Sequence, residues 1–77
     1  PTEGLSIVSF KLSEEDFVTL EVIDIEGRQL KELFSGQAAA EAEFRFQFDG
    51  TGLPNGVYLY RLTTTKEIII KKFLIAK

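Results

Sequence analysis

Paired acidic side chains are the residues of this chain that could perform chemistry most directly. Glu41 and Glu43 lie two positions apart in the sequence, and two carboxylates on one strand face could act as the acid and base of glycoside hydrolysis. Throughout residues 41–48, however, polar and charged residues alternate with apolar ones. Because charged side chains seldom enter a core unpaired, this alternation favours a solvent-facing strand surface over a catalytic pair.

Two sets of loop carboxylates could in principle hold a calcium ion, which prefers clustered oxygen ligands. One is the acidic run at residues 14–16, and the other combines Asp24, Glu26 and Asp49. Neither spacing matches a calcium-binding loop. We therefore expect no metal site and no cofactor.

The chain of 77 residues contains neither histidine nor cysteine. It thus lacks the usual base of a nucleophilic triad, and it can form neither disulfides nor thiolate metal sites. A domain of this size also needs nearly all of its apolar residues, 44% of the chain, to offset the entropy lost on folding. Little remains for a buried catalytic pocket, and we expect a protein that is not an enzyme.

Apolar residues recur at every second position through most of the chain, which is the period of strands that bury one face. Strands are expected at residues 5–12, 17–24, 28–34, 41–48, 57–63 and 67–76, and residues 38–41 are expected to form a connection. The pattern predicts one domain over residues 1–77 of all-β class, a small immunoglobulin-like antiparallel β-sandwich of six to seven strands. The inward-facing residues are Val8, Phe10, Leu12, Val18, Leu20, Val22, Phe44, Phe46 and Phe48.

Several local features refine this prediction. Leu30 and Leu33 break the alternation of the third strand, as a β-bulge allows, and Gly36 is expected to end it. Residues 49–56 hold three glycines and a proline, which indicates a long turn in which Asn55 and Gly56 can take positive φ. These glycines do not form a phosphate-binding loop, because such a loop leads into a helix.

Tyr58 follows the long turn directly. Its hydroxyl could bond to upstream backbone as a tyrosine corner, or its ring could simply fill the core. The sequence leaves both readings open.

Positive charge collects near the C-terminal end of an acidic chain. Residues 1–56 hold eleven acidic and four basic residues, whereas residues 57–77 hold five basic residues and only Glu67. The sequence pI of ≈ 4.9 opposes nucleic-acid binding. The lysines either protect an exposed sheet edge from self-pairing or serve recognition. They also interrupt the longest apolar run, residues 68–75, which is too short for a membrane span.

Four segments together resemble one known family. They are PTEG at residues 1–4, VTLEVIDIEGR at 18–28, LPNGVYLYRL at 53–62 and KFLIAK at 72–77, with FDGTGL at 48–53 between the second and the third. In this order they resemble the C-terminal sorting domains of cargo exported by the type IX secretion system of certain Gram-negative bacteria. The resemblance covers essentially the whole chain and is most specific at residues 53–62 and 72–77.

This resemblance implies a sorting domain at the end of a larger secreted protein, from which residues 1–77 are excised. The implied partners are an N-terminal cargo domain, the type IX export machinery and a sortase-like surface protease, and the implied location is the cell surface or the medium, reached through the periplasm. The family motifs place the secretion signal at ten residues: Gly56, Val57, Tyr58, Leu59, Lys71, Lys72, Phe73, Leu74, Ile75 and Lys77. Of these, Gly56, Tyr58, Phe73 and Ile75 are better explained by the needs of the fold, whereas Lys71, Lys72 and Lys77 are better candidates for recognition, because a core has no use for them.

Two other functions remain open from the sequence. The domain could be an immunoglobulin-like accessory or carbohydrate-binding module of a secreted hydrolase, provided that Tyr60 or Phe17 faces solvent. It could also be a structural spacer, since flagellar hook-capping proteins carry domains with a similar motif.

Overall fold

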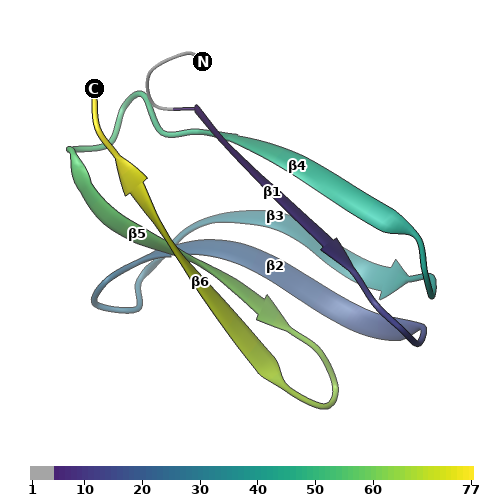
Figure 1. The fold of residues 1–77 in the computed structure, drawn as a ribbon. Helices are drawn as coiled ribbons and strands as arrows, with labels where there is room; N and C mark the ends of the chain where they lie inside the picture. The colour runs from purple at the N-terminus through teal and green to yellow at the C-terminus, as the bar shows by residue number, and fades with distance from the viewer. Residues whose placement is uncertain (1–4) are drawn as a thin grey trace.

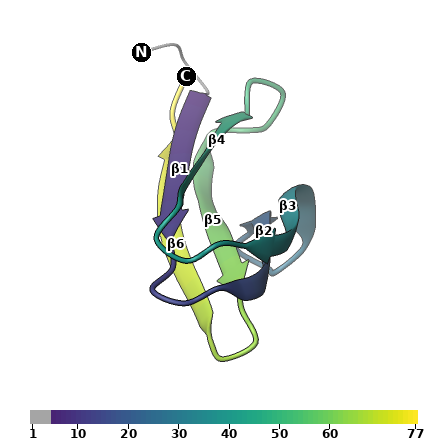
Figure 2. The same ribbon diagram turned by 90° about the vertical axis from the view of Figure 1, so that its right-hand side faces the viewer.

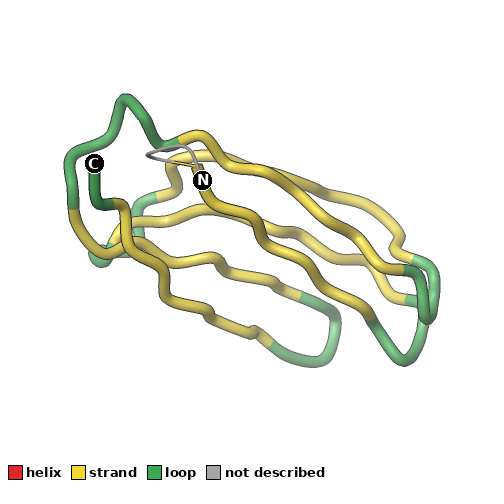
Figure 3. The backbone as a smooth tube through the Cα atoms, turned by 45° about the horizontal axis from the view of Figure 1, so that its top comes forward, coloured by secondary structure: helices red, strands yellow, loops and turns green. Residues whose placement is uncertain are grey.

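The computed structural model describes residues 5–77, which form six strands: β1 (Leu5–Lys11), β2 (Asp16–Asp24), β3 (Gln29–Ala38), β4 (Glu43–Asp49), β5 (Gly56–Thr63) and β6 (Ile68–Ile75). Figure 3 shows that short loops join most of these strands, with a longer one between β4 and β5. Over this range no helix is present that could cross a membrane. The motif at residues 1–4 lies outside the described residues.

The strands form two antiparallel sheets that face each other (Figures 1 and 2). One sheet contains only β1 and β4, whereas the other has four strands in the order β3-β2-β5-β6. The prediction of a small antiparallel sandwich is therefore confirmed, with six strands. β3 and β6 are the edges of the larger sheet.

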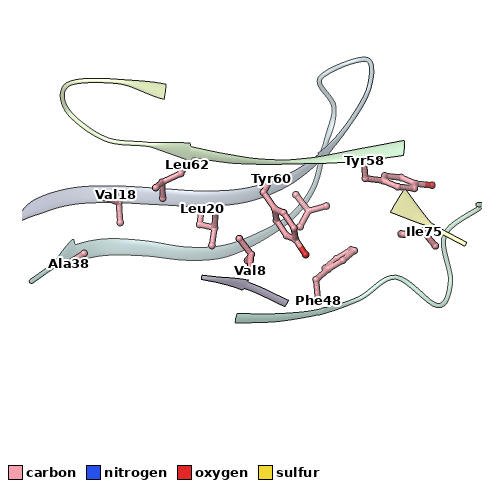
Figure 4. Close-up of a cluster of buried hydrophobic side chains, with 10 residues drawn as sticks. Val8, Val18, Leu20, Ala38, Phe48, Tyr58, Tyr60, Leu62 and Ile75 are labelled. Atoms are coloured by element: carbon pink, nitrogen blue, oxygen red, sulfur yellow. The ribbon is translucent and has the colours of Figure 1, made fainter. Parts of the chain in front are cut away.

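The core fills the space between the sheets (Figure 4). β2 contributes Val18, Leu20 and Val22, which are 0%, 1% and 0% exposed. β1 and β4 cover them with Val8 and Phe48. All nine residues expected to face inward are either part of this core or packed against it, because the period-two pattern sets the buried face of each strand.

Aromatic side chains of β4 reach both edges of the larger sheet. Phe44 and Phe46 contact Phe34 of β3, with ring centroids 5.5 and 5.6 Å apart. Phe48 meets Phe73 of β6 edge-on at 6.2 Å. Such ring pairs add to the stabilisation from burial, so the narrow sheet is held across the full width of the broad one.

The pairing of β3 with β2 contains the predicted irregularity. The register shifts twice, and the β3 residues passed over are Leu33 and Leu30, so the bulge prediction is confirmed. The expected end of the strand at Gly36 is wrong. β3 continues to Ala38, which pairs with Asp16 and is 0% exposed. The burial of the Ala38 side chain in the core stabilises these last residues of the strand.

The turn before β5 takes its positive φ at one of the two expected positions. Gly56 has a φ of 154°, a conformation that side chains rarely adopt. The expectation for Asn55 is wrong, since Glu41 alone combines a side chain with positive φ in residues 5–77. Asn55 is held differently, because its side-chain oxygen accepts a hydrogen bond from the backbone N–H of Lys77 at 3.1 Å.

Replacing Gly56 by valine should lower the free energy of unfolding by about 1 kcal/mol or more, because the backbone conformation disfavours any Cβ. Gly52 in the same turn is the matched control, since a Cβ there has no neighbour within 4 Å and no unfavourable φ. Gly52→Val should change the stability by less than about 0.5 kcal/mol. Urea unfolding of both variants measures the difference, and equal losses would contradict the argument.

Candidate recognition surface on the C-terminal hairpin

β5 and β6 form a hairpin at the edge of the larger sheet, and β6 has a neighbouring strand on one side only. All ten residues predicted as the signal lie in this hairpin or immediately after it. Directly opposed residues of an antiparallel pair point to the same face. The register of the hairpin therefore separates the predicted residues into two groups.

The inner group belongs to the fold. Tyr58 pairs with Phe73, and Gly56 pairs with Ile75. Tyr58 and Ile75 are 8% and 2% exposed, and Phe73 packs against the core. Lys71 pairs with the buried Tyr60 and so shares this side, but its own side chain is exposed.

The outer face of the hairpin is formed by Val57, Leu59, Arg61, Thr63, Ile68, Ile70, Lys72 and Leu74. Ile68, Ile70 and Leu74 are 62%, 49% and 65% exposed. Exposed aliphatic side chains gathered on adjacent strands are typical of interaction surfaces. Ile68 and Ile70 are not among the residues predicted from the sequence, although the alternation along β6 places them beside Lys72 and Leu74.

The lysines of β6 take part in no salt bridge within residues 5–77. The salt bridges in residues 5–77 involve Arg28, Arg61 and Lys66, but neither Lys71 nor Lys72. A cation beside exposed aliphatic groups suits a partner surface that is apolar and carries acidic groups.

The long turn is tied to the hairpin at two points. The Tyr58 hydroxyl donates a hydrogen bond of 2.6 Å to the carbonyl of Pro54, so the tyrosine-corner reading is confirmed. The Lys77 ammonium donates to the carbonyls of Thr51 and Leu53. Lys77 thus has a structural role that the sequence motif did not predict, because the donors and acceptors are brought together only by folding.

Tyr60 does not face solvent. It is 3% exposed, and its ring stacks on Phe73 with centroids 4.3 Å apart. Its buried hydroxyl lies near the Ser6 hydroxyl but makes no hydrogen bond of normal geometry within residues 5–77. Burial raises the pKa of Tyr60, and the nearby Ser6 hydroxyl opposes that rise only in part. The expectation that Tyr60 could bind a glycan is therefore wrong, which leaves Phe17, 49% exposed, as the only aromatic candidate from that hypothesis.

The tip of the hairpin is fastened to the β1–β2 turn. The Lys66 ammonium donates to a Glu14 carboxylate oxygen at 2.5 Å, and the Thr65 hydroxyl donates to Asp16 at 2.8 Å. The hydrogen bond from Lys66 lowers the pKa of Glu14, and the hydrogen bond from Thr65 lowers the pKa of Asp16. Both carboxylates therefore hold the β5–β6 turn in place.

The other carboxylates considered for calcium also bond to their own loops. Asp24 accepts hydrogen bonds from the backbone N–H groups of Glu26 and Arg28 and from the Arg28 side chain. The backbone bond from Arg28 is the main cause of the lowered pKa of Asp24. Asp49 likewise accepts a hydrogen bond from the backbone N–H of Thr51. In residues 5–77 no three acidic side chains are grouped so that they could hold a metal ion.

These features define a small all-β domain whose C-terminal hairpin exposes an apolar and basic outer face. A family model described as a secretion system C-terminal sorting domain matches residues 1–76. The chain belongs to this family, the C-terminal sorting domains of type IX secretion. Neither curated proteins nor solved structures gave a match.

Membership of this family has direct consequences. A type IX sorting domain acts as a secretion signal, and it implies export across the outer membrane of a Gram-negative bacterium. It also implies contact with the type IX machinery and a cargo on the N-terminal side.

The two tyrosines allow a paired test of the hairpin anchor. Tyr58→Phe should lower the free energy of unfolding by about 1 kcal/mol, because it removes a hydrogen bond to a backbone carbonyl. Tyr60→Phe should leave the stability unchanged or raise it, because it removes a buried hydroxyl that forms no regular hydrogen bond within the described residues. Chemical unfolding of the two variants compares them directly, and a larger loss for Tyr60→Phe would refute this account.

Acid should weaken the domain through four carboxylates whose pKa values folding lowers: Glu14, Asp16, Asp24 and Asp49. A carboxylate whose pKa is lower in the folded state stabilises the protein at pH values above its unfolded-state pKa. That stabilisation is lost as the pH falls through the folded-state pKa. The thermal midpoint should thus stay level near neutral pH and fall below about pH 4. Asp16→Asn should flatten that fall. A wild-type midpoint independent of pH down to about pH 3 would contradict the prediction.

Proposed function

We propose that the domain of residues 1–77, the terminal part of a larger secreted protein, carries its export signal on the outer face of the β5–β6 hairpin and performs no catalysis. The observation that carries this proposal is the exposed row of Ile68, Ile70 and Leu74 with Lys72 beside it, which forms no salt bridge within residues 5–77. Aliphatic side chains exposed on an edge hairpin do not stabilise the fold, but they offer a receptor apolar surface to bind. Gly56, Tyr58, Phe73 and Ile75 then serve the signal by holding the hairpin in shape.

After export, we infer that a sortase-like surface protease removes the domain and that the cargo is released or joined to anionic lipopolysaccharide. Family membership supports this step, since a sorting signal has no use once its cargo has reached the surface. Mass spectrometry of the exported passenger should then find it without residues 5–77.

Export of a passenger fused ahead of residues 1–77 tests the proposed function in a host that has the type IX route. The wild-type fusion should reach the cell surface or the medium, and retention in the periplasm would falsify the proposal. Fractionation with immunoblotting of the passenger measures the distribution. A second fusion that lacks residues 57–77 should stay in the periplasm.

Substitutions on the outer face test where the signal lies. Lys72→Glu and the pair Ile70→Ser with Leu74→Ser should reduce export at least about tenfold, because hot-spot residues carry most of the energy of an interface. Matched controls are Lys31→Glu on exposed β3 and Ile25→Ser, 71% exposed in the β2–β3 turn. These should export normally. All variants should unfold at similar temperatures. Equal export of the outer-face and control variants would show that the signal does not lie on the outer face.

A further inference from the structure

The start of β6 carries a segment that is complementary to a second copy of itself. Residues 67–71 read EIIIK, with an acid and a base at the two ends of three isoleucines. In an antiparallel pair of two such segments centred on Ile69, Glu67 of one copy lies opposite Lys71 of the other. Opposite charges that face each other across a strand pair stabilise it, and like charges destabilise it. The segment therefore favours an antiparallel partner of its own sequence.

The main chain of this segment can accept such a partner. β6 pairs only with β5 within residues 5–77. The Thr64 N–H donates to the Glu67 carbonyl across the hairpin turn at 2.9 Å, and bonding groups alternate in direction along an antiparallel strand. The N–H and C=O groups of Ile68, Ile70 and Lys72 therefore point away from β5. In a pair centred on Ile69, Ile68 of each copy would exchange hydrogen bonds with Ile70 of the other.

The side chains of the segment are exposed on both faces of β6. Ile68, Ile69 and Ile70 are 62%, 45% and 49% exposed. Ile69 points inward, but the two-stranded sheet does not cover it. Natural edge strands usually avoid self-pairing through charge, irregularity or short length. Three consecutive exposed isoleucines on an edge have the opposite effect, and a second copy would cover Ile69 with its own Ile69.

The charges at the two ends of the segment are not used within the domain. Neither Glu67 nor Lys71 takes part in a salt bridge within residues 5–77. Across the hairpin, Lys71 lies opposite the uncharged Tyr60. The groove between β1 and β6 is lined by three basic and three acidic residues, namely Lys11, Lys66, Lys71, Glu14, Asp16 and Glu67. This balance favours a partner that presents one charge of each sign, as a second copy does.

The lysines of β6 select among the possible registers. A pairing centred on Lys71 or Lys72 places that lysine opposite its own copy, which like-charge repulsion disfavours. A pairing centred on Ile69 brings opposite charges together instead. Its one like-charge contact places Lys72 opposite Lys66 of the second copy, and Lys66 is already bonded to Glu14. The register centred on Ile69 is therefore favoured over those centred on a lysine.

The other edge of the larger sheet limits the assembly to two copies. β3 is irregular, because its register with β2 shifts at Leu33 and Leu30. Bulges of this kind disfavour pairing with a further strand. Joined through β6, two sheets would have β3 at both outer edges. A closed two-fold dimer results, since the same edge is used by both copies.

We propose that two copies of this domain associate edge to edge through β6, in antiparallel register, with Ile69 at the two-fold axis and Glu67 facing Lys71 of the other copy. Main-chain hydrogen bonds supply affinity in this mode of association, and the facing side chains fix the register. The outer faces of both hairpins lie on the same side of the joined sheet. The inference goes beyond the proposed function, because export through the outer face does not require a second copy.

Complementary charge reversals test the proposed contact. In sedimentation velocity from about 10 µM to 2 mM, the domain should dimerise with a dissociation constant of about 0.05–0.5 mM. Glu67→Lys and Lys71→Glu should each weaken dimerisation at least about tenfold, because each places like charges opposite each other. An equimolar mixture of the two variants should form a heterodimer within about threefold of the wild-type affinity.

Two control variants carry the same charge change at other positions. Lys72→Glu, one residue further along β6, should not weaken dimerisation, because it removes the contact between like charges. Lys31→Glu on β3 should leave dimerisation unchanged. All of the replaced side chains are exposed, so the variants should unfold at temperatures similar to that of the wild type.

Single cysteines test the register, since the chain has none of its own. Under mild oxidation Ile69→Cys should form an intermolecular disulfide at least about tenfold faster than Ile70→Cys, because only position 69 faces its own copy. Three results would overturn the inference: a monomer up to about 2 mM, a dimer that persists in both charge variants, or faster cross-linking at position 70. Glu67→Lys should leave export of a fused passenger unchanged, so either proposal can fail while the other stands.

Discussion

Two strands, β1 and β4, must cover the inner face of a four-stranded sheet, and the remaining structure follows from how they do so. β4 reaches both edges of the broad sheet through phenylalanines at every second position, which contact Phe34 on one edge and Phe73 on the other. The centre of the core is buried from solvent, with Leu20 1% exposed. Cover runs out beside β1, where the start of β6 stays open to solvent. The same shortage of strands that makes the core small therefore also creates the free surfaces of the domain.

The C-terminal hairpin combines a fixed half and an open half. Phe73 and Ile75 secure the end of β6 in the core, and the Tyr58 hydroxyl holds the turn that leads into β5. The start of β6 is instead held from its tip, where Lys66 bonds to Glu14. A strand fixed at both ends but uncovered in the middle keeps a defined shape while it exposes side chains. That arrangement presents a fixed set of side chains to solvent.

The sequence was sufficient for the fold because burial in a sandwich imposes a period of two, and a period is visible without coordinates. Even the bulge residues Leu30 and Leu33 could be identified, since each breaks that period. Contacts between distant segments could not be predicted from the sequence. The position of Lys77 on the carbonyls of Thr51 and Leu53 depends on how the chain folds back. Likewise, Tyr60 follows Tyr58 by two positions, yet only packing distinguishes the bonded hydroxyl from the orphaned one.

β1 and β6 belong to different sheets, and this affects how the domain responds to force. Cargo connects ahead of β1, so any tension transmitted through it enters the small sheet at Leu5 and loads the β1–β4 ladder first. The hairpin belongs to the other sheet, which β1 reaches through the β1–β2 turn, through side-chain packing and through the contacts of that turn with the hairpin tip. Tension on the cargo would thus strain the β1–β4 ladder before it reached the β5–β6 hairpin.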